Sequence, residues 1–284
     1  MATEVVSQST KRAPVSRAFP KIPWWVLILA AGGVGVIYAI LSDVNYRDTF
    51  QFLLAGVVVT LRITLTAFPI ATVLGLFVGL ARTSKNQLLF TPATIYVEVI
   101  RGIPLVVLIL IIAFGIVPIF VDSVNRLGAW GLSWSSLGLF QLFSDFSIRS
   151  ISLELRAIIA LALGYGAFEA EVFRAGIQSI GRGQMEAARS LGMNYIQSMR
   201  LIILPQAVRR ILPPLGNDFI ALLKDSSLAT VLAVNELTQL TRIRRSSTFR
   251  VMEAFNVVAF LYLSLTLFLS GLVRYLERRM KIGD

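Results

Sequence analysis

The sequence contains no cysteine and no histidine among its 284 residues. The chain therefore forms no disulfide, and it has neither a thiolate nucleophile nor an imidazole base. The same absences remove the usual protein ligands of zinc and haem. Catalysis that depends on thiols, on histidine or on metals held by these residues is excluded.

A nucleotide-binding loop is missing as well. The pattern G-x-x-x-x-G-K-[ST], whose backbone N–H groups and lysine hold nucleotide phosphates, occurs nowhere in the sequence. Energy from ATP would therefore have to come through a separate protein. We expect no cofactor in this chain.

Charged residues are scarce. They make up 15% of the sequence, against 56% hydrophobic residues, whereas soluble domains carry about 25% charged residues. The apolar residues form runs long enough to cross a hydrocarbon layer of about 30 Å as helices. The sequence therefore predicts an all-α membrane protein with about six transmembrane helices. The short alternating segments of a strand barrel are absent.

The apolar runs also predict the topology. The first run begins at Trp24 and Trp25, lacks a small-residue cleavage site and has full span length, so it is predicted to be an uncleaved span rather than a signal peptide. We expect a cytoplasmic N-terminus, and an even number of spans then places the basic C-terminal tail on the same side. Segment 122–152 is then an outer loop, with an amphipathic piece around Trp130 and Trp134. The predicted spans are 24–41, 52–81, 95–121, 155–180, 206–223 and 253–273.

Net charge is +11, but the basic residues mostly flank the spans. This arrangement favours membrane topology and anionic headgroups over nucleic acid. Four arginines between the last two predicted spans disagree with the positive-inside rule, because the predicted topology places them outside: Arg242, Arg244, Arg245 and Arg250. They suit either a solvated loop or contact with a soluble binding protein.

A charged stretch, "EAARSLGMNYIQSMRLIILP" at 186–205, interrupts the apolar runs. It predicts a helix over 184–191 that ends at Gly192. A second helix follows, capped by Asn194 with Gln197 three residues later. These properties alone suit either a helix–turn–helix that docks a partner or an amphipathic helix on the membrane surface.

The residue pattern of this stretch resembles the "EAA" loop of ABC importer permeases. Glu186-Ala187-Ala188 is followed by Gly192 and by Leu204-Pro205 at the family's spacing. Further stretches narrow the resemblance, which covers about 50–280, to permeases for polar amino acids. They are "YVEVIRGIPL" (96–105), "AEVFRAGIQSI" (170–180), "LPQAVRRILPPLGNDFIALLKDSSLA" (204–229) and "LERRM" (276–280).

The resemblance implies a transmembrane subunit that is not itself an enzyme, in the bacterial cytoplasmic (inner) membrane. Its loop 181–205 would dock on an ATPase dimer, which binds ATP and magnesium. A second permease copy or paralogue, an extracytoplasmic binding protein, an amino acid and membrane lipid would be the other partners, with no nucleic acid. The residues implied in coupling to the ATPase are Glu186, Ala187, Ala188, Leu191 and Gly192.

The resemblance also suggests a division of the chain. Such permeases are commonly built on five spans. Residues 46–284 would form the permease domain. Residues 1–45 would then be a cytoplasmic tail and an additional transmembrane helix.

Polar residues inside the predicted spans are candidates for the solute site, because burying them in a membrane is costly. Pro213 and Pro214 predict an interrupted helix near the midplane, where backbone groups can line a cavity. Asp218 and Lys224 offer opposite charges for a zwitterion, although Lys224 can instead pair with Asp225. In the family these positions contribute to a substrate site. The candidates are Asn217, Asp218, Lys224, Ser226, Ser227 and Glu169.

The other intramembrane charges have structural interpretations. Glu171 lies about 200° around the helix from Glu169, so the two cannot face one cavity. Glu171 can neutralise Arg174, which lies three residues later. Glu98 and Arg101, near the inner end of their span, suit either a gate or the scaffold, and the scaffold is favoured.

Two other function classes stay open. An ion-gradient-driven secondary transporter would usually show internal repeats, and none is evident. An intramembrane enzyme would need an aspartate pair or a serine–lysine dyad, and the acids here lack such a pairing.

Overall fold

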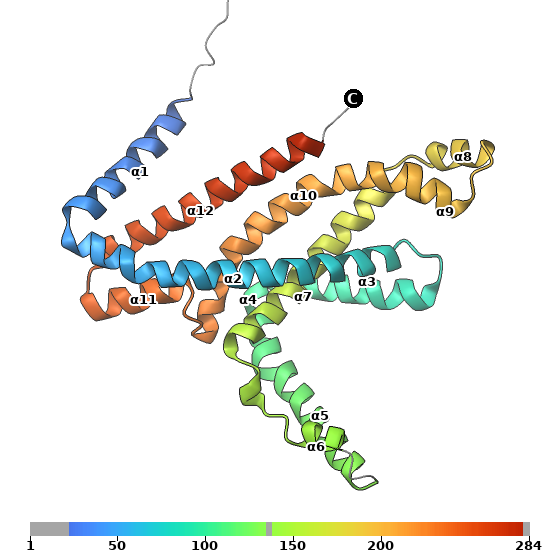
Figure 1. Cartoon of the computed structure of the whole chain (residues 1–284), viewed down its shortest axis with the longest axis horizontal. Coiled ribbons are helices and arrows are strands. Elements are labelled where there is room, and N and C mark those ends of the chain that lie inside the picture. The colour runs from blue at the N-terminus through green and yellow to red at the C-terminus, as the bar shows by residue number, and fades with distance from the viewer. Residues whose placement is uncertain (1–22, 135–137, 281–284) are drawn as a thin grey trace, which may run out of the picture.

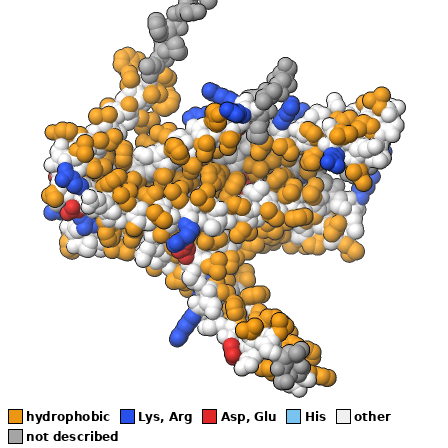
Figure 2. All heavy atoms as spheres, viewed as in Figure 1, with side chains coloured by type: hydrophobic (Ala, Val, Ile, Leu, Met, Phe, Trp, Pro, Cys, Tyr) orange, Lys and Arg blue, Asp and Glu red, His pale blue; other side chains and the backbone are white. Residues whose placement is uncertain are grey.

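A computed structural model describes residues 23–134 and 138–280. All regular structure in these two ranges is helical (Figure 1). The predicted N-terminal tail, apart from Pro23, lies outside the described residues, as do 135–137 of the predicted outer loop and 281–284. Side chains at the surface are mainly hydrophobic over the face in Figure 2, as suits a chain surrounded by lipid.

The helices follow one another with short connections. They are α1 (Trp24–Ser42), α2 (Val44–Ala81), α3 (Gln87–Gly102), α4 (Leu105–Ile111), the π-helix η1 (Ile112–Ile116), α5 (Val117–Leu132), α6 (Gly138–Ser144), the 3-10 helix η2 (Ile148–Ser150), α7 (Leu153–Gln178), α8 (Arg182–Ser190), α9 (Tyr195–Ser198), the π-helix η3 (Met199–Ile203), α10 (Leu204–Asp225), the 3-10 helix η4 (Ser226–Leu232), α11 (Leu237–Thr248) and α12 (Val251–Met280).

Four helical segments are long and apolar enough to cross a membrane. They are Trp24–Ser42, Val44–Ala81, Leu105–Leu132 and Val251–Arg279. The predicted spans at 155–180 and 206–223 correspond to α7 and α10, which are not among these four. The total of six spans therefore stays a prediction.

Helix α7 forms the centre of the molecule and packs along α2. Small residues allow this close approach: a Cβ at Gly75 would lie 2.8 Å from Glu169 Cβ, and one at Gly79 only 2.7 Å from the carbonyl oxygen of Ala170. The buried Arg156 fixes the start of α7 by donating to the carbonyl oxygens of Ala113, Ile148 and Ile151.

Both ends of the bundle are visible in Figure 1. One end carries α8, α9 and the α2–α3 connection, and we call it the α8 end. The opposite end carries the α1–α2 junction and α11, and we call it the α11 end. Helix α7 leads toward the α8 end and α10 leads away from it.

The predicted span 95–121 is wrong in its continuity. Helix α3 ends at Gly102, and Ile103 is extended, with φ −103° and ψ 133°. Ile103 precedes Pro104, and proline disfavours the helical region for the residue before it. The chain resumes at α4 and stays helical to Leu132, so the predicted span end at 121 falls inside a helix, which also includes Trp130 of the predicted amphipathic piece. The outer position of 122–152 stays a prediction.

The predicted break at Pro213 and Pro214 is wrong as well. Helix α10 contains both prolines without interruption. Proline's fixed φ is compatible with a helix, and the packing of α10 against α7 and α12 holds the turn despite the missing hydrogen bonds. Regular helix ends later, at η4, after which Ala233 has a φ of 55°. Helix α11 then starts at the buried cap Glu236, whose carboxylate accepts the N–H groups of Thr238 and Gln239.

Candidate functional site

The structure separates the predicted solute-binding residues into two groups. Glu169 is completely buried on α7, and Asp218 is half-buried on α10. Ser226 is buried at the start of η4, but its hydroxyl donates to the carbonyl oxygen of Leu223 and is therefore occupied. Asn217 and Lys224 are exposed, and Ser227 is half-buried.

Glu169 and Asp218 belong to a group of oxygen-bearing side chains where α2, α7 and α10 meet. Thr72 lies about one turn before Gly75, whose backbone packs against Glu169 Cβ, and the buried oxygens of Thr72, Glu169 and Asp218 have no hydrogen-bond partner among the described residues. The Tyr165 hydroxyl donates to Asp225 Oδ2 at 2.8 Å. We call these five residues the oxygen cluster: Thr72, Tyr165, Glu169, Asp218 and Asp225.

The pairing of Lys224 with Asp225 that the sequence left open is not formed. No described carboxylate lies within 4.0 Å of the Lys224 ammonium group, and Asp225 accepts from Tyr165 instead. Lys224 is exposed on one side of α10 together with Arg210, Pro214 and Asn217. Their spacing of three, four and seven residues gives α10 one exposed stripe with three polar side chains.

Two members of the oxygen cluster were missed from the sequence. Tyr165 precedes Glu169 by one helical turn, and a buried tyrosine usually needs a hydrogen-bond partner, so it could have been found. Thr72 gave no signal, because threonine is common in apolar helices and its neighbour Glu169 is far away in the chain.

The structural interpretation of Glu171 and Arg174 agrees with the contacts. Arg174 Nε donates to Glu171 Oε2 at 3.0 Å, and Arg82 Nη1 lies 2.8 Å from the same oxygen. Arg82 also reaches Glu98 at 3.1 Å. Arg101 lies over the ring of Phe168, 5.8 Å from its centroid. These contacts tie α2, α3 and α7 together near the α8 end.

A groove of about 380 Å³ runs between α7 and α10 on this half of the molecule. Its lining is mainly apolar, with a few polar side chains at the edge: Glu171, Val172, Ala175, Gly176, Ser179, Arg210 and Pro214. The groove lies next to the exposed stripe of α10, because Arg210 and Pro214 belong to both.

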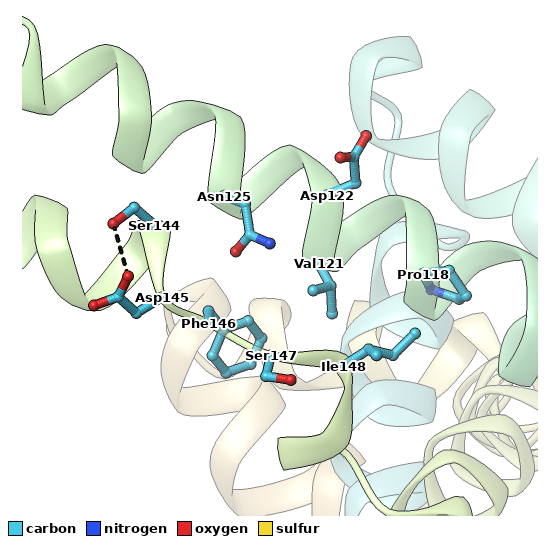
Figure 3. A pocket seen from close by; sticks show the side chains of 9 residues that line it. All are labelled: Pro118, Val121, Asp122, Asn125, Ser144, Asp145, Phe146, Ser147 and Ile148. Carbon is cyan, nitrogen blue, oxygen red and sulfur yellow. Dashed lines mark hydrogen bonds between the residues drawn. The ribbon is translucent and has the colours of Figure 1, made fainter.

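A second pocket, of about 430 Å³, lies between α5 and the segment that joins α6 to η2 (Figure 3). Asn125 points into it, whereas Asp122 points away and pairs with Arg126 at 2.9 Å. The two acids of this pocket, Asp122 and Asp145, lie apart and do not converge on one point. The pocket contains none of the predicted site residues.

The charged loop 181–205 forms two short helices at the α8 end. Helix α8 begins two residues before the predicted 184 and ends one residue before the predicted 191. Gly192 has a φ of 80° and donates to Arg189 O, while Met193 donates to Ala188 O. This is the Schellman cap that the glycine predicted.

The predicted capping box of α9 is also present. Gln197 N donates to Asn194 Oδ1 at 2.8 Å, and Asn194 N donates to Gln197 Oε1 at 2.9 Å. Of the residues implied in coupling, Glu186, Ala187, Leu191 and Gly192 are exposed, whereas Ala188 is buried within the chain. Leu191 and Ile196 expose 80% and 74% of their surface, which gives the protruding loop two apolar contact points.

Known proteins are similar to this chain over most of its length. Residues 71–282 match the sequence model of the family described as "Binding-protein-dependent transport system inner membrane component". The glutamine transport system permease protein GlnP of Escherichia coli strain K12 is 36% identical over 230 residues, which cover 81% of this chain and 93% of that protein. The probable glutamine ABC transporter permease protein GlnM of Bacillus subtilis strain 168 is 38% identical over 234 residues, 82% of this chain and 95% of that protein.

Solved structures share the fold. The crystal structure of an amino acid ABC transporter with histidines contains a chain that matches with a TM-score of 0.66 and 36% identity, covering 84% of this chain and 98% of that chain. An inward-facing structure of the MetNI methionine ABC transporter matches with a TM-score of 0.61 at 21% identity, covering 81% and 97%. The second likeness concerns the fold alone.

Proposed function

This chain belongs to the family of binding-protein-dependent transport system inner membrane components, and from that membership we infer that it is the permease subunit of an ATP-driven ABC importer for polar amino acids. The named relatives are permeases of amino acid transporters, and they align with most of the chain. This similarity favours an ABC importer over the secondary transporter and the intramembrane enzyme, the two alternatives that the sequence left open.

The observation that carries the coupling mechanism is the protruding, doubly capped loop at the α8 end. Its exposed surface combines Glu186, Ala187, Leu191 and Ile196, and such apolar points within a polar rim suit a protein interface. We propose that this surface docks on a partner ATPase, which binds ATP and magnesium. Ala188 supports it from within the chain.

The loop connects the two helices that carry the proposed solute site. Helix α8 follows α7, and α10 follows α9 and η3, so a push on α8 acts on both helices through covalent connections. In the proposed mechanism, closure of the ATPases shifts α7 against α10 and exposes the oxygen cluster alternately to the two sides of the membrane. We propose that Asn217 and Lys224, on the exposed side of α10, and the half-buried Ser227 line the solute's route between this chain and a second permease, and that the buried Ser226 fixes the start of η4 beside them.

The remaining assembly is proposed on the same basis. The α8 end faces the cytoplasm, both termini are cytoplasmic, and an extracytoplasmic binding protein delivers the amino acid at the α11 end. A second permease, identical or paralogous, covers the polar stripe of α10, since such residues are costly against lipid. Residues 46–284 form the permease domain. The preceding 1–45 supply a tail and an additional transmembrane helix, because α1 buries no residue within the chain.

A tagged pull-down from native membranes tests the coupling. The wild-type chain is expected to retain an ATPase, and Ala187→Arg with Leu191→Glu is expected to lose it, because charged side chains replace two exposed apolar residues of the docking surface. Ala188 is left unchanged, because an arginine at a buried position would disturb the fold. Ser247→Arg, exposed on α11 at the opposite end, is the matched control.

The outcomes separate clearly. Retention by the wild type and by Ser247→Arg, with loss in the α8-loop variant, supports the proposal. Absence of an ATPase from the wild-type eluate would contradict the importer function. Equal retention by all three chains would contradict docking at this loop.

A further inference from the structure

Helix α11 and the residue before α12 carry the four arginines that disagree with the positive-inside rule: Arg242, Arg244, Arg245 and Arg250. No described carboxylate lies within 4.0 Å of any of them. Arg244 is held within the chain, since its Nε donates to Thr49 Oγ1 at 3.3 Å and its guanidinium group lies 5.7 Å from the centroid of the Phe52 ring. The positive charge at this end is therefore not balanced by ion pairs among the described residues.

Two of these arginines share a surface with apolar side chains. Arg242 and Arg245 lie three residues apart, so they project from one side of α11, and both are exposed. Phe249 follows about one turn later and exposes 87% of its surface, and Met252 exposes 67%. A groove of about 480 Å³ lies beside Arg242 and is also lined by Gln239, Ile243, Ser246 and Ser247. We define the α11 patch as Arg242, Arg245, Phe249, Arg250 and Met252.

Phe249 has an unusual backbone conformation. It ends α11 in the left-handed region, with a φ of 58° and a ψ of 15°. Glycine and asparagine favour this region, whereas a bulky side chain is strained there. Because the side chain is largely exposed, packing within the chain does not compensate for the strain. A strained, exposed aromatic residue at a helix end favours a contact outside the chain.

The position of the patch indicates what it contacts. The candidate span Trp24–Ser42 ends near the α1–α2 junction, and the candidate span Val251–Arg279 begins directly after Arg250. Both points lie at the α11 end of the bundle (Figure 1). The ends of apolar spans mark the boundary between the hydrocarbon layer and the headgroups. At this depth lipid phosphates can pair with the arginines, and acyl chains can surround Phe249 and Met252.

We propose that the α11 patch binds the phosphate groups of anionic phospholipids, with Phe249 inserted among the adjoining acyl chains. A guanidinium group can donate two parallel hydrogen bonds to a phosphate. The other possible occupant is an acidic surface of a soluble protein, which would leave Phe249 and Met252 in water whenever that protein dissociates. Lipid covers them continuously, so charge and apolar surface together favour lipid. This inference goes beyond the proposed function and holds for any transported solute.

Tryptophan fluorescence of the purified permease–ATPase complex in vesicles tests this inference. Phe249→Trp places a reporter in the patch, and the signal of the complex without this substitution is subtracted. The vesicles contain phosphatidylglycerol and phosphatidylcholine, of which one or the other carries bromine as a short-range quencher. We expect the lipid next to the reporter to be phosphatidylglycerol in roughly fivefold preference, as expected for an arginine near an anionic headgroup.

Variants in the Phe249→Trp background separate charge from apolar contact. Arg242→Gln with Arg245→Gln should lower the preference to near parity, because the attraction is electrostatic. Arg242→Lys with Arg245→Lys retains both charges and should retain most of the preference. Arg126→Gln is the control, since Arg126 is also exposed but is already paired with Asp122 at 2.9 Å. It should leave the preference unchanged.

A separate variant tests whether Phe249 supports the fold. Glycine adopts a φ of 58° without strain, so Phe249→Gly should leave the unfolding midpoint in detergent unchanged or raise it. A lower midpoint would show that the ring stabilises the chain from within, which would contradict an external contact.

The quenching results each decide the inference. Equal quenching by both brominated lipids would contradict phosphate recognition. Quenching by aqueous iodide, with none by either lipid, would assign the patch to a soluble partner instead, and no quenching by any of these would place it against another protein chain. Copurified ATPase in the same samples reports on the proposed function, so failure of one is distinguishable from failure of the other.

Discussion

Helices α1 and α7 are both uninterrupted α-helices, but they stand in opposite relations to the rest of the molecule. Helix α1 buries none of its 19 residues and contacts mainly α2 and α12. Helix α7 has 26 residues, more than half of them buried, and it packs on α2, α3, α4 and α10. Hydrophobic composition alone would rank them in the reverse order, because α1 is a candidate span and α7 is not.

The difference shows that, in a membrane protein, high hydrophobicity of a helix does not indicate burial within the protein. In lipid, an apolar surface costs nothing to expose, so a very hydrophobic helix can lie at the periphery. A central helix needs small residues for close approach and can carry polar ones, since other helices cover them. Glycine and alanine on α7, with the buried Glu169 and Tyr165, follow this pattern.

The strongest test of the comparison exchanges one glycine in each environment for alanine. Gly79→Ala is expected to destabilise the chain by about 2–3 kcal/mol, because its new Cβ would lie 2.7 Å from Ala170 O and 2.8 Å from Phe173 Cβ. Gly33→Ala in α1 meets nothing within 4 Å and should be neutral or slightly stabilising. Thermal unfolding midpoints in detergent measure both. Similar midpoints for the two variants would contradict the close α2–α7 packing.

A second test asks whether ion pairs add to that packing. Arg82→Gln removes the contacts to Glu171 and Glu98 that join α7 to α2 and α3, and we expect a loss of about 1–2 kcal/mol. Most of it should come from Glu171, because Glu98 is exposed and solvent screens its charge.

Arg126→Gln is the control for this test, since its pair with Asp122 is exposed on both sides. We expect a change below about 0.5 kcal/mol for it. Urea or thermal unfolding of the two proteins, compared with the wild type, gives the difference. If Arg126→Gln proved as destabilising as Arg82→Gln, the idea that the Arg82 ion pairs stabilise the packing of α2, α3 and α7 near the α8 end would be refuted.

The smallest effect is expected at the periphery. Replacing Gly32, Gly33 and Gly35 together by leucine fills positions with nothing within 4 Å, so the unfolding midpoint should stay within about 2 °C of the wild type, equivalent to a few tenths of a kcal/mol. The amount of copurified ATPase should also be unchanged. A selective loss of another copurified protein would show instead that α1 packs on a partner.

Local chemistry predicted the loop at the α8 end well. Gly192 and the Asn194–Gln197 pair define their caps through contacts within a few residues, and the structure contains both. Hydrophobicity likewise predicted an all-helical membrane protein. The family resemblance that the charged loop carried agrees with the matched relatives.

Features that depend on distant residues were not predictable in this way. The oxygen cluster joins Thr72, Glu169 and Asp218 across three helices, and no local pattern shows that they meet. Lys224 was grouped with Asp218 by charge, yet its position on α10 leaves it exposed. The proline pair was expected to break α10, but surrounding helices hold that helix together. Tertiary packing decided each of these cases.

The two caps of the α8 loop have a mechanical consequence. Because the Schellman turn and the capping box fix the backbone on both sides of Gly192, the loop between α8 and α9 should deform little. A displacement of α8 should then move α9 with it, and bending should concentrate in η3, the π-helical turn at Met199–Ile203. The rigid loop would then move as one unit, and the start of α10 would pivot relative to it at η3.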